Sequence, residues 1–393
     1  MDQVAGSSRL LRAINETAAL GHLLERGPLT RGDLRELTGL AKPTTSDVLR
    51  RLQDAGLVKV VGRTSGGPGP NAEVYAVDPD AAYMAAVSVR ARDFSMATAV
   101  CDLTGTVRAR RETGVDERAA DPVAAVAEAV QAACRQARIP LRRLDHVQLG
   151  VPGSYDESTE TIRFIDVPDW SRPGLIGEIR ARLRTEVSVD NDADLAAVAE
   201  RNRGVATDVD SFALLWLGEE GLGLGIELGG KLLRGGRGAA GEIGYMPVGL
   251  PAQSDGGPAV VHDFHDLASG QAVHELAEKY GIAADSGYEA AAVINSTDEL
   301  ADDARAFRDA LAVRIAVGIT AVIAVLDPPL VVLGGDIGQA AGPPLAEAVS
   351  VALSQLSVLQ TTVAATGVAD DAVLLGALDS ALAKVRATLL GRR

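Results

Sequence analysis

The chain has 393 residues, with 38 Lys and Arg against 53 Asp and Glu, which gives a formal net charge of −15. This length suggests two or three domains, and the 47% hydrophobic content excludes a largely disordered chain. The two cysteines, Cys101 and Cys134, each lie in an apolar stretch. We therefore expect buried thiols, and so few cysteines exclude a disulfide framework or a Cys-rich zinc site.

No targeting or membrane segment is predicted. The N-terminal sequence lacks the continuous apolar segment of a signal peptide. The longest uncharged apolar run, from Ile315 to Leu326, is shorter than the roughly 20 residues that cross a bilayer. We therefore expect a cytoplasmic protein with no membrane partner.

The first part of the chain predicts a winged helix-turn-helix domain. Thr30 with Asp33 is a helix N-cap pattern, while Gly27-Pro28 and Gly39 interrupt helices. Apolar spacing and these boundaries predict helices over residues 9–25, 30–38 and 43–55. Two β-rich runs, 57–61 and 74–77, flank a polar Gly-rich loop and predict the hairpin of the wing.

The charge is divided unevenly between this domain and the remainder. Residues 1–77 contain ten Lys and Arg against eight Asp and Glu, a net charge of +2, so the other 316 residues carry −17. The second helix of a helix-turn-helix enters the major groove of double-stranded DNA, held by Lys, Arg and hydroxyl side chains. The candidate DNA-binding residues are Lys42, Thr44, Thr45, Ser46, Arg50 and Arg51, which we expect to lie largely outward, and Arg63 in the wing. The alternative is a small helical domain whose charges form a solvated face.

From about residue 81 the pattern becomes α/β. An Ala-rich helix is predicted over 122–138, and Gly229-Gly230 predicts a hairpin turn. Strands are predicted by short apolar runs over residues 85–89, 96–101, 146–151, 212–217, 224–228 and 331–333.

Five segments in order resemble the ROK family, which comprises bacterial sugar kinases and sugar-responsive repressors. They are Leu-Gly-Val-Pro-Gly at 149–153, Val-Asp-Asn-Asp-Ala-Asp at 189–194, Gly-Leu-Gly-Leu-Gly at 221–225, Gly-Ala-Ala-Gly-Glu-Ile-Gly at 238–244 and Leu-Asp-Pro-Pro-Leu-Val-Val-Leu-Gly-Gly at 326–335. A winged helix before such a domain is typical of the regulators of the family.

The resemblance implies an α/β chain with two domains. Residues 1–78 would be the winged helix-turn-helix, and 79–393 a two-lobed actin-like/hexokinase (ribonuclease H-like) ATPase fold that senses a sugar and dimerises. One lobe would comprise roughly 79–195 plus the C-terminal helix, and the other roughly 196–375.

The phosphoryl-transfer machinery of the family kinases is degraded in this sequence. The resemblance places Asp192 at the position of the kinase base. The phosphate loop, Asp-x-Gly-Gly-Thr in the kinases, reads Arg-Ala-Arg-Asp-Phe at 90–94, so the glycines that let backbone approach phosphate are missing. Glu219 and Glu220 would also repel a triphosphate if they face it. We expect no ATP cofactor and no enzymatic activity.

The sugar-binding positions of the family are partly retained. Asn191, Asp192 and Glu242 match residues that the resemblance assigns to sugar hydroxyls. Tyr245 replaces a family histidine, His265 stands where the family has a sugar-binding Glu, and Asp166 lies near its usual Asn. The cysteine run of the family zinc site is missing, and we expect no metal. A substitute metal site at His262, Asp263 and His265 is one alternative, but ordinary surface or cleft structure is the favoured interpretation.

Three functions follow from these observations. The first is a transcriptional regulator, a repressor by preference, controlled by a sugar, sugar derivative or sugar phosphate. Such a protein would bind an operator as a homodimer or a dimer of dimers. The second is a sugar kinase with an accessory domain. The third is a regulator whose second domain serves only for dimerisation and docking.

Overall fold

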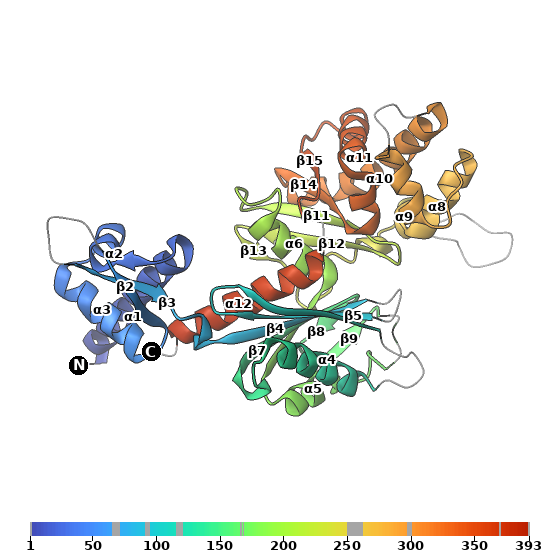
Figure 1. Ribbon diagram of the computed structural model, residues 1–393. Helices are drawn as coiled ribbons and strands as arrows, with labels where there is room; N and C mark the ends of the chain where they lie inside the picture. The colour runs from blue at the N-terminus through green and yellow to red at the C-terminus, as the bar shows by residue number, and fades with distance from the viewer. Residues whose placement is uncertain are drawn as a thin grey trace.

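The computed structural model describes residues 2–64, 71–90, 95–114, 121–165, 167, 169–249, 262–296, 301–368 and 371–391. Asp166, the tip of the predicted wing and most of the altered phosphate loop lie outside these residues. The chain forms a small N-terminal domain and two α/β lobes (Figure 1). Helix α12 (Ala372–Gly391) runs from the junction of the lobes to the N-terminal domain.

The N-terminal domain is a winged helix, as predicted. It comprises α1 (Asp2–Arg26), β1 (Leu29–Thr30), α2 (Arg31–Thr38), α3 (Lys42–Asp54), β2 (Val58–Arg63) and β3 (Glu73–Val77). The Thr30 Oγ1 accepts from the Asp33 amide, and the Asp33 carboxylate accepts from the Thr30 amide, so the predicted N-cap of α2 is confirmed. The strand order is β1-β3-β2. Strand β1 was not predicted, because two residues carry no periodic signal.

Lobe 1 is a five-stranded sheet in the order β10-β7-β4-β5-β6. Its strands are β4 (Tyr83–Arg90), β5 (Ser95–Asp102), β6 (Val107–Gly114), β7 (Leu144–Val151) and β10 (Glu186–Asn191), and β8 (Ser154–Asp156) pairs with β9 (Thr161–Arg163) beside it. Helices α4 (Pro122–Ala137) and α5 (Leu175–Leu183) cover one face, and α12 covers the other (Figure 1). Strand β6 was not predicted because its edge position leaves most of its side chains polar and exposed.

Lobe 2 is a second five-stranded sheet in the order β13-β12-β11-β14-β15. Its strands are β11 (Phe212–Leu217), β12 (Leu222–Leu228), β13 (Lys231–Leu232), β14 (Leu330–Gly334) and β15 (Thr362–Ala365). Its helices are α7 (His265–Ala268), α8 (Gly270–Lys279), α9 (Gly287–Ile294), α10 (Asp302–Leu326) and α11 (Gly335–Leu356). A short 3-10 turn occupies Ile243–Tyr245, and two others, Pro79–Ala81 and Leu141–Arg143, precede strands of lobe 1. The predicted turn at Gly229-Gly230 is confirmed, since both glycines have positive φ between β12 and β13.

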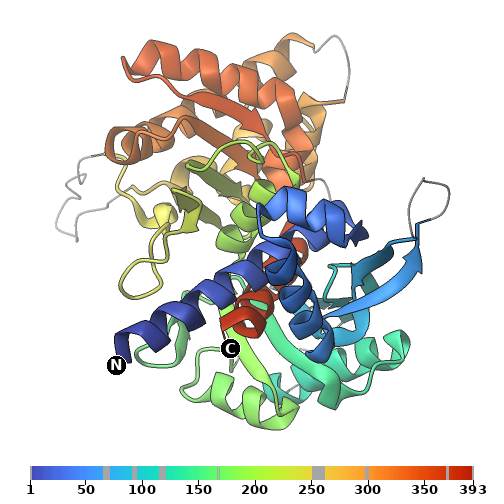
Figure 2. The same ribbon diagram turned by 90° about the vertical axis from the view of Figure 1, so that its left-hand side faces the viewer.

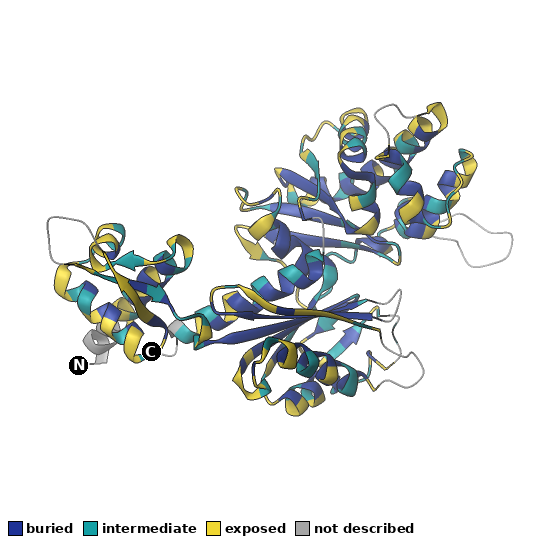
Figure 3. Ribbon diagram, in the orientation of Figure 1, coloured by how far each residue is buried: buried dark blue, intermediate teal, exposed yellow. Residues whose placement is uncertain are grey.

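Helix α10 has one buried and one uncovered apolar face. Among the described helices it alone is long and apolar enough to cross a bilayer. Phe307, Leu311 and Ile315 on one face are nevertheless fully buried in the core of lobe 2. Val317 and Val325 on the outer face are 38% and 81% exposed, whereas the central strands of both lobes are buried (Figure 3). We interpret α10 as a core helix whose second face is left exposed by the described residues.

Helix α6 (Asp192–Arg203) joins the two lobes. A Cβ atom at Gly376 of α12 would collide with the main-chain carbonyl of Leu195, and one at Gly225 of β12 with that of Ala193. A Cβ atom at Gly150 of β7 would instead collide with the side chains of Leu195 and Val373. The lobe boundary predicted near residue 195 therefore falls within a helix that packs against both sheets.

The glycine at position 376 is open to a direct test. Gly376→Ala would favour a helix by propensity, but the added methyl group has to displace the backbone of α6, and overpacking costs about 1–3 kcal/mol. We expect a lower melting temperature by scanning fluorimetry. Gly177→Ala in α5 is the matched control, because nothing lies within 4 Å of its Cβ position and it should melt at the same or a higher temperature. Equal melting of both variants would contradict the close packing.

Candidate DNA-binding and ligand-binding sites

The outer face of α3 presents polar side chains away from the winged-helix core. Lys42 and Arg50 are exposed, and Thr44 and Ser46 are half-buried. Arg50 pairs with Asp47 at 3.3 Å and Asp54 at 3.7 Å. Exposed ion pairs of this kind contribute little to stability, so Arg50 can exchange these carboxylates for a phosphate or a base edge. Arg63, at the end of β2, is exposed and lies 3.8 Å from Glu73.

Two residues predicted to lie outward do not. Thr45 is 2% exposed, because it precedes Val48, Leu49 and Leu52 at core-facing helical spacing, and its hydroxyl donates to the Ala41 carbonyl. Arg51 is half-buried, and its Nε lies 3.2 Å from the carboxylate of Glu16, a buried residue of α1. The prediction of outward side chains is wrong for Thr45 and Arg51, which hold α3 in its domain.

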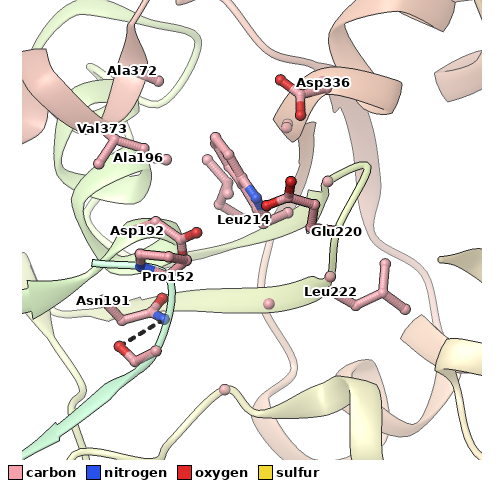
Figure 4. Close-up of a pocket in the computed structure, with 18 of the residues that line it drawn as sticks. Pro152, Asn191, Asp192, Ala196, Leu214, Glu220, Leu222, Asp336, Ala372 and Val373 are labelled. Atoms are coloured by element: carbon pink, nitrogen blue, oxygen red, sulfur yellow. Dashed lines mark hydrogen bonds between the residues drawn. The ribbon is translucent and has the colours of Figure 1, made fainter. Parts of the chain in front are cut away.

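The two lobes enclose a cavity of about 540 Å³ at the N-terminus of α6 (Figure 4). Its walls come from the end of β7, the β11–β12 turn, the 240–245 segment, α7, the β14–α11 junction and the start of α12. Of the predicted ligand-binding residues, the cavity brings together Asn191, Asp192, Glu242, Tyr245 and His265. Asp166 lies outside the described residues.

Asn191 and Asp192 sit where β10 turns into α6. The Asn191 Oδ1 caps the helix by accepting from the Ala193 amide at 2.8 Å, and its Nδ2 donates to the Gly153 carbonyl (Figure 4). The Asp192 side chain points into the cavity in Figure 4. The pKa of Asp192 is raised to about 7, chiefly by burial and in addition by the negative charges of Glu242 and Asp336.

Glu242 links the lobes at the opposite wall. It accepts a hydrogen bond from the Ser154 hydroxyl of β8. Beside it, the ring of Tyr245 lies 5.4 Å from that of Phe164 and 5.1 Å from that of His265, measured between centroids. Phe164 lines the cavity although half of it is exposed, and the sequence analysis missed it. An apolar residue that the chain leaves in solvent carries no recognisable spacing signal.

The part of the cavity between the β11–β12 turn and α11 is acidic. Glu219 accepts from the amides of Gly287 and Tyr288 at 3.0 and 2.7 Å, so it caps α9. Glu220 and Asp336 also line this wall, and Glu220 points toward the cavity in Figure 4. These carboxylates do not fit the polyphosphate of ATP, which needs amides or cations at close range.

A zinc ion of the family type does not fit the described residues either. Both cysteines are buried in lobe 1, where burial raises the thiol pKa to about 12 for Cys101 and about 11 for Cys134. The prediction that they are packing residues is confirmed. In the described part of the chain, no three His, Cys, Asp or Glu side chains are grouped to hold a metal ion.

A winged helix joined to a two-lobed α/β domain with a cleft at the lobe junction defines the class of this protein. Its family follows from the sequence models: the ROK family matches residues 87–384, and the MarR family matches residues 11–67. Because the first match spans more than half of the chain, the protein belongs to the ROK family.

Both regulators and kinases resemble this chain. The DNA-binding transcriptional dual regulator NagC of Escherichia coli K12 is 25% identical over 247 residues, covering 62% of this chain and 59% of the relative. The crystal structure of a ROK family transcriptional regulator, homolog of the E. coli MLC protein, superposes with TM-score 0.75 at 20% identity over 98% of this chain and 100% of the other. ROK hexokinase from Thermus thermophilus matches with TM-score 0.62 and 26% identity over 77% of this chain and 99% of the enzyme.

The environment of Asp192 leads to a pH prediction. The native state holds the proton of this carboxyl more tightly than the unfolded state, because its pKa is raised to about 7 from 3.8. The stabilising effect of the protonated form is therefore complete below pH 4 and is lost as pH rises through about 7. Asp192→Asn, which cannot ionise, should gain melting temperature relative to the wild type between pH 5 and 8. Asp303→Asn at the exposed start of α10 is the control, and a pH-independent difference for Asp192→Asn would contradict the assignment.

Proposed function

We propose that this protein is a cytoplasmic transcriptional repressor whose ROK domain binds a sugar or sugar derivative and thereby controls operator binding. The observation that carries the proposal is the physical link between the two sites. Asp371 and the first two residues of α12, Ala372 and Val373, line the cavity. The other end of this 20-residue helix reaches the winged helix. At 1.5 Å per residue this helix spans about 30 Å.

The link is apolar where α12 meets the winged helix. Leu382 and Val385 of α12 belong to the same buried cluster as Leu20 and Leu23 of α1. Figure 2 shows α1 crossing close to the C-terminal end of the chain. A ligand that changes the angle between the lobes would rotate α12 and the attached α1, and it would act only through a difference in affinity for the two arrangements.

Footprinting on the DNA that flanks the gene, with and without sugars, tests this function. We expect Arg50→Ala to weaken operator binding by about 1–3 kcal/mol without changing the melting temperature. Arg51→Ala should lower the melting temperature, because Glu16 would lose its partner in a buried position. Arg182→Ala, on the exposed face of α5, is the control. A protected operator unaffected by Arg50→Ala would remove this residue from the interface.

The proposal includes a homodimer, because two winged-helix domains are needed to bind the two half-sites of an operator. The exposed valines Val313, Val317 and Val325 of α10 support this assembly, since no charged residue follows Arg314 in this helix. Two such sets of valines would cover one another in a two-fold pair, and further pairing would give a dimer of dimers.

Light scattering after size exclusion measures the assembly. We expect Val317→Lys to convert a dimer into a monomer, because a charge would be buried between two copies. Val107→Lys, on the edge strand of lobe 1, adds the same charge at an equally exposed valine far from α10 and should leave the dimer intact. A dimer that survives Val317→Lys would place the interface elsewhere, and association of the wild type with lipid vesicles would assign this face to a membrane instead.

We further propose that the protein uses no ATP and no metal. The sugar kinase alternative draws support from the retained Asp192 and from the kinase relatives, but the acidic wall opposes it. Phosphorylation of a sugar panel that is lost in Asp192→Asn would establish the kinase. The docking-platform alternative would gain support if no sugar stabilised the protein or altered DNA binding.

A further inference from the structure

The cavity at the lobe junction is lined by carboxylates from both lobes. They are Asp192, Glu219, Glu220, Glu242, Asp336 and Asp371. Among the described lining residues, the one Arg or Lys is Arg90, and its guanidinium pairs with Asp371, which Arg110 also contacts. Glu112 lies within ion-pair distance of both arginines, so two cations and two carboxylates balance at this wall and leave no net positive charge for a ligand.

Within the described part of the chain, the hydrogen-bond donors to three of the carboxylates are uncharged. Asp192 accepts from the Ala193 amide at 2.8 Å and Glu242 from the Ser154 hydroxyl. Asp336 accepts a long bond of 3.5 Å from the Glu219 amide. Each carboxylate offers about four lone-pair sites, so most of their accepting capacity remains for a ligand. The cavity thus combines excess negative charge with an excess of acceptors.

The aromatic corner is a second and independent feature of the same cavity. Phe164 and Tyr245 are 51% and 54% exposed, and their rings form a continuous surface with that of His265. Exposed rings at the mouth of a polar cavity stack on the apolar face of a sugar ring, and their π faces attract cations. The backbone of Phe164 has a φ of 57°, an unfavourable value for a Phe. Such strain is typically retained at binding sites.

We propose that the effector is an unphosphorylated sugar with a protonated amino group, whose ring packs on Phe164 and Tyr245 while its ammonium and hydroxyl groups donate to Asp192, Glu242 and Asp336. This inference rests on the proposed sugar-sensing function and specifies its ligand. An ammonium group supplies three donors and the compensating charge, whereas a phosphate supplies acceptors only and adds negative charge to an acidic cavity.

Matched trios of sugars test the charge preference directly. Glucosamine and glucose 6-phosphate each differ from glucose at one substituent, and the same holds for the corresponding galactose and mannose derivatives. We expect affinity by calorimetry to fall from amine to parent hexose to phosphate within the trio of the preferred stereochemistry. Added salt should weaken binding of the amine, because the attraction is between charges.

Variants at the acidic wall separate this interaction from general effects on the fold. Asp336→Asn should weaken binding of the amino sugar about tenfold or more, since a hydrogen bond to a charged group is replaced by a neutral one, while binding of the neutral hexose changes less. Glu347→Gln is the control on the same helix, because Glu347 is exposed and does not line the cavity. Loss of affinity for amine and hexose alike would show that Asp336 has no charge-specific role and would overturn the proposal.

The outcomes distinguish this inference from the proposed function. A neutral sugar or a sugar phosphate that binds more tightly than the amine and alters operator binding would overturn the inference and leave the sensor intact. Failure of all the sugars to bind, with operator binding unresponsive, would overturn both. Binding of the amine with the expected rank order and its loss in Asp336→Asn would support both.

Discussion

The close packing of α6 against glycines is the constraint on which the rest of the structure depends. Gly376 of α12 and Gly225 of β12 allow the backbone of α6 to approach both lobes at a separation that no side chain would permit. Dispersion attraction falls steeply with distance, so this close approach strengthens the contact between α6 and both lobes. Because α6 belongs to neither lobe alone, it holds the two sheets together while leaving a cavity at its N-terminus.

The packing of α6 also determines how the cavity is connected to the winged helix. The buried Glu200 at the other end of α6 accepts from the amides of Gly367 and Val368, in the segment that leads into α12. Helix α12 packs along the side of α6 and continues to α1, while this carboxylate binds the segment that precedes α12. A two-state change at the cavity has a continuous, well-packed path to the winged helix, which is what a switch between distant sites requires.

Under the proposed function, the cavity is a phosphoryl-transfer scaffold adapted to recognition. The potential base is retained as Asp192, but burial and the neighbouring carboxylates Glu242 and Asp336 raise its pKa, and these carboxylates would repel a phosphate. Glu219, in the turn where polyphosphate would approach, is used as a cap for α9. Electrostatics that oppose catalysis here favour ligands rich in donors, and binding alone is sufficient for a regulator.

Much of the fold could be predicted from the sequence, because its signals are local. The cap at Thr30, the turn at Gly229-Gly230 and most strand positions depend on neighbours within a few residues, and the structure confirms them. The family motifs also identified five residues that do line one cavity. The misses have equally physical causes: β6 is a polar edge strand, and Thr45 and Arg51 face inward because of the direction in which α3 packs.

The sequence by itself determined the class of each domain and the order of the domains along the chain. It also showed that the N-terminal domain is mildly basic and the remainder acidic. Tertiary structure alone decided which carboxylates meet, because Asp192, Glu242 and Asp336 come from segments far apart in the chain. It also decided that Phe164 lies at the cavity and that α12 reaches from the cavity to the winged helix. Local patterns report the backbone path and the buried face, whereas charge and shape at a site depend on distances between segments that only the packed fold sets.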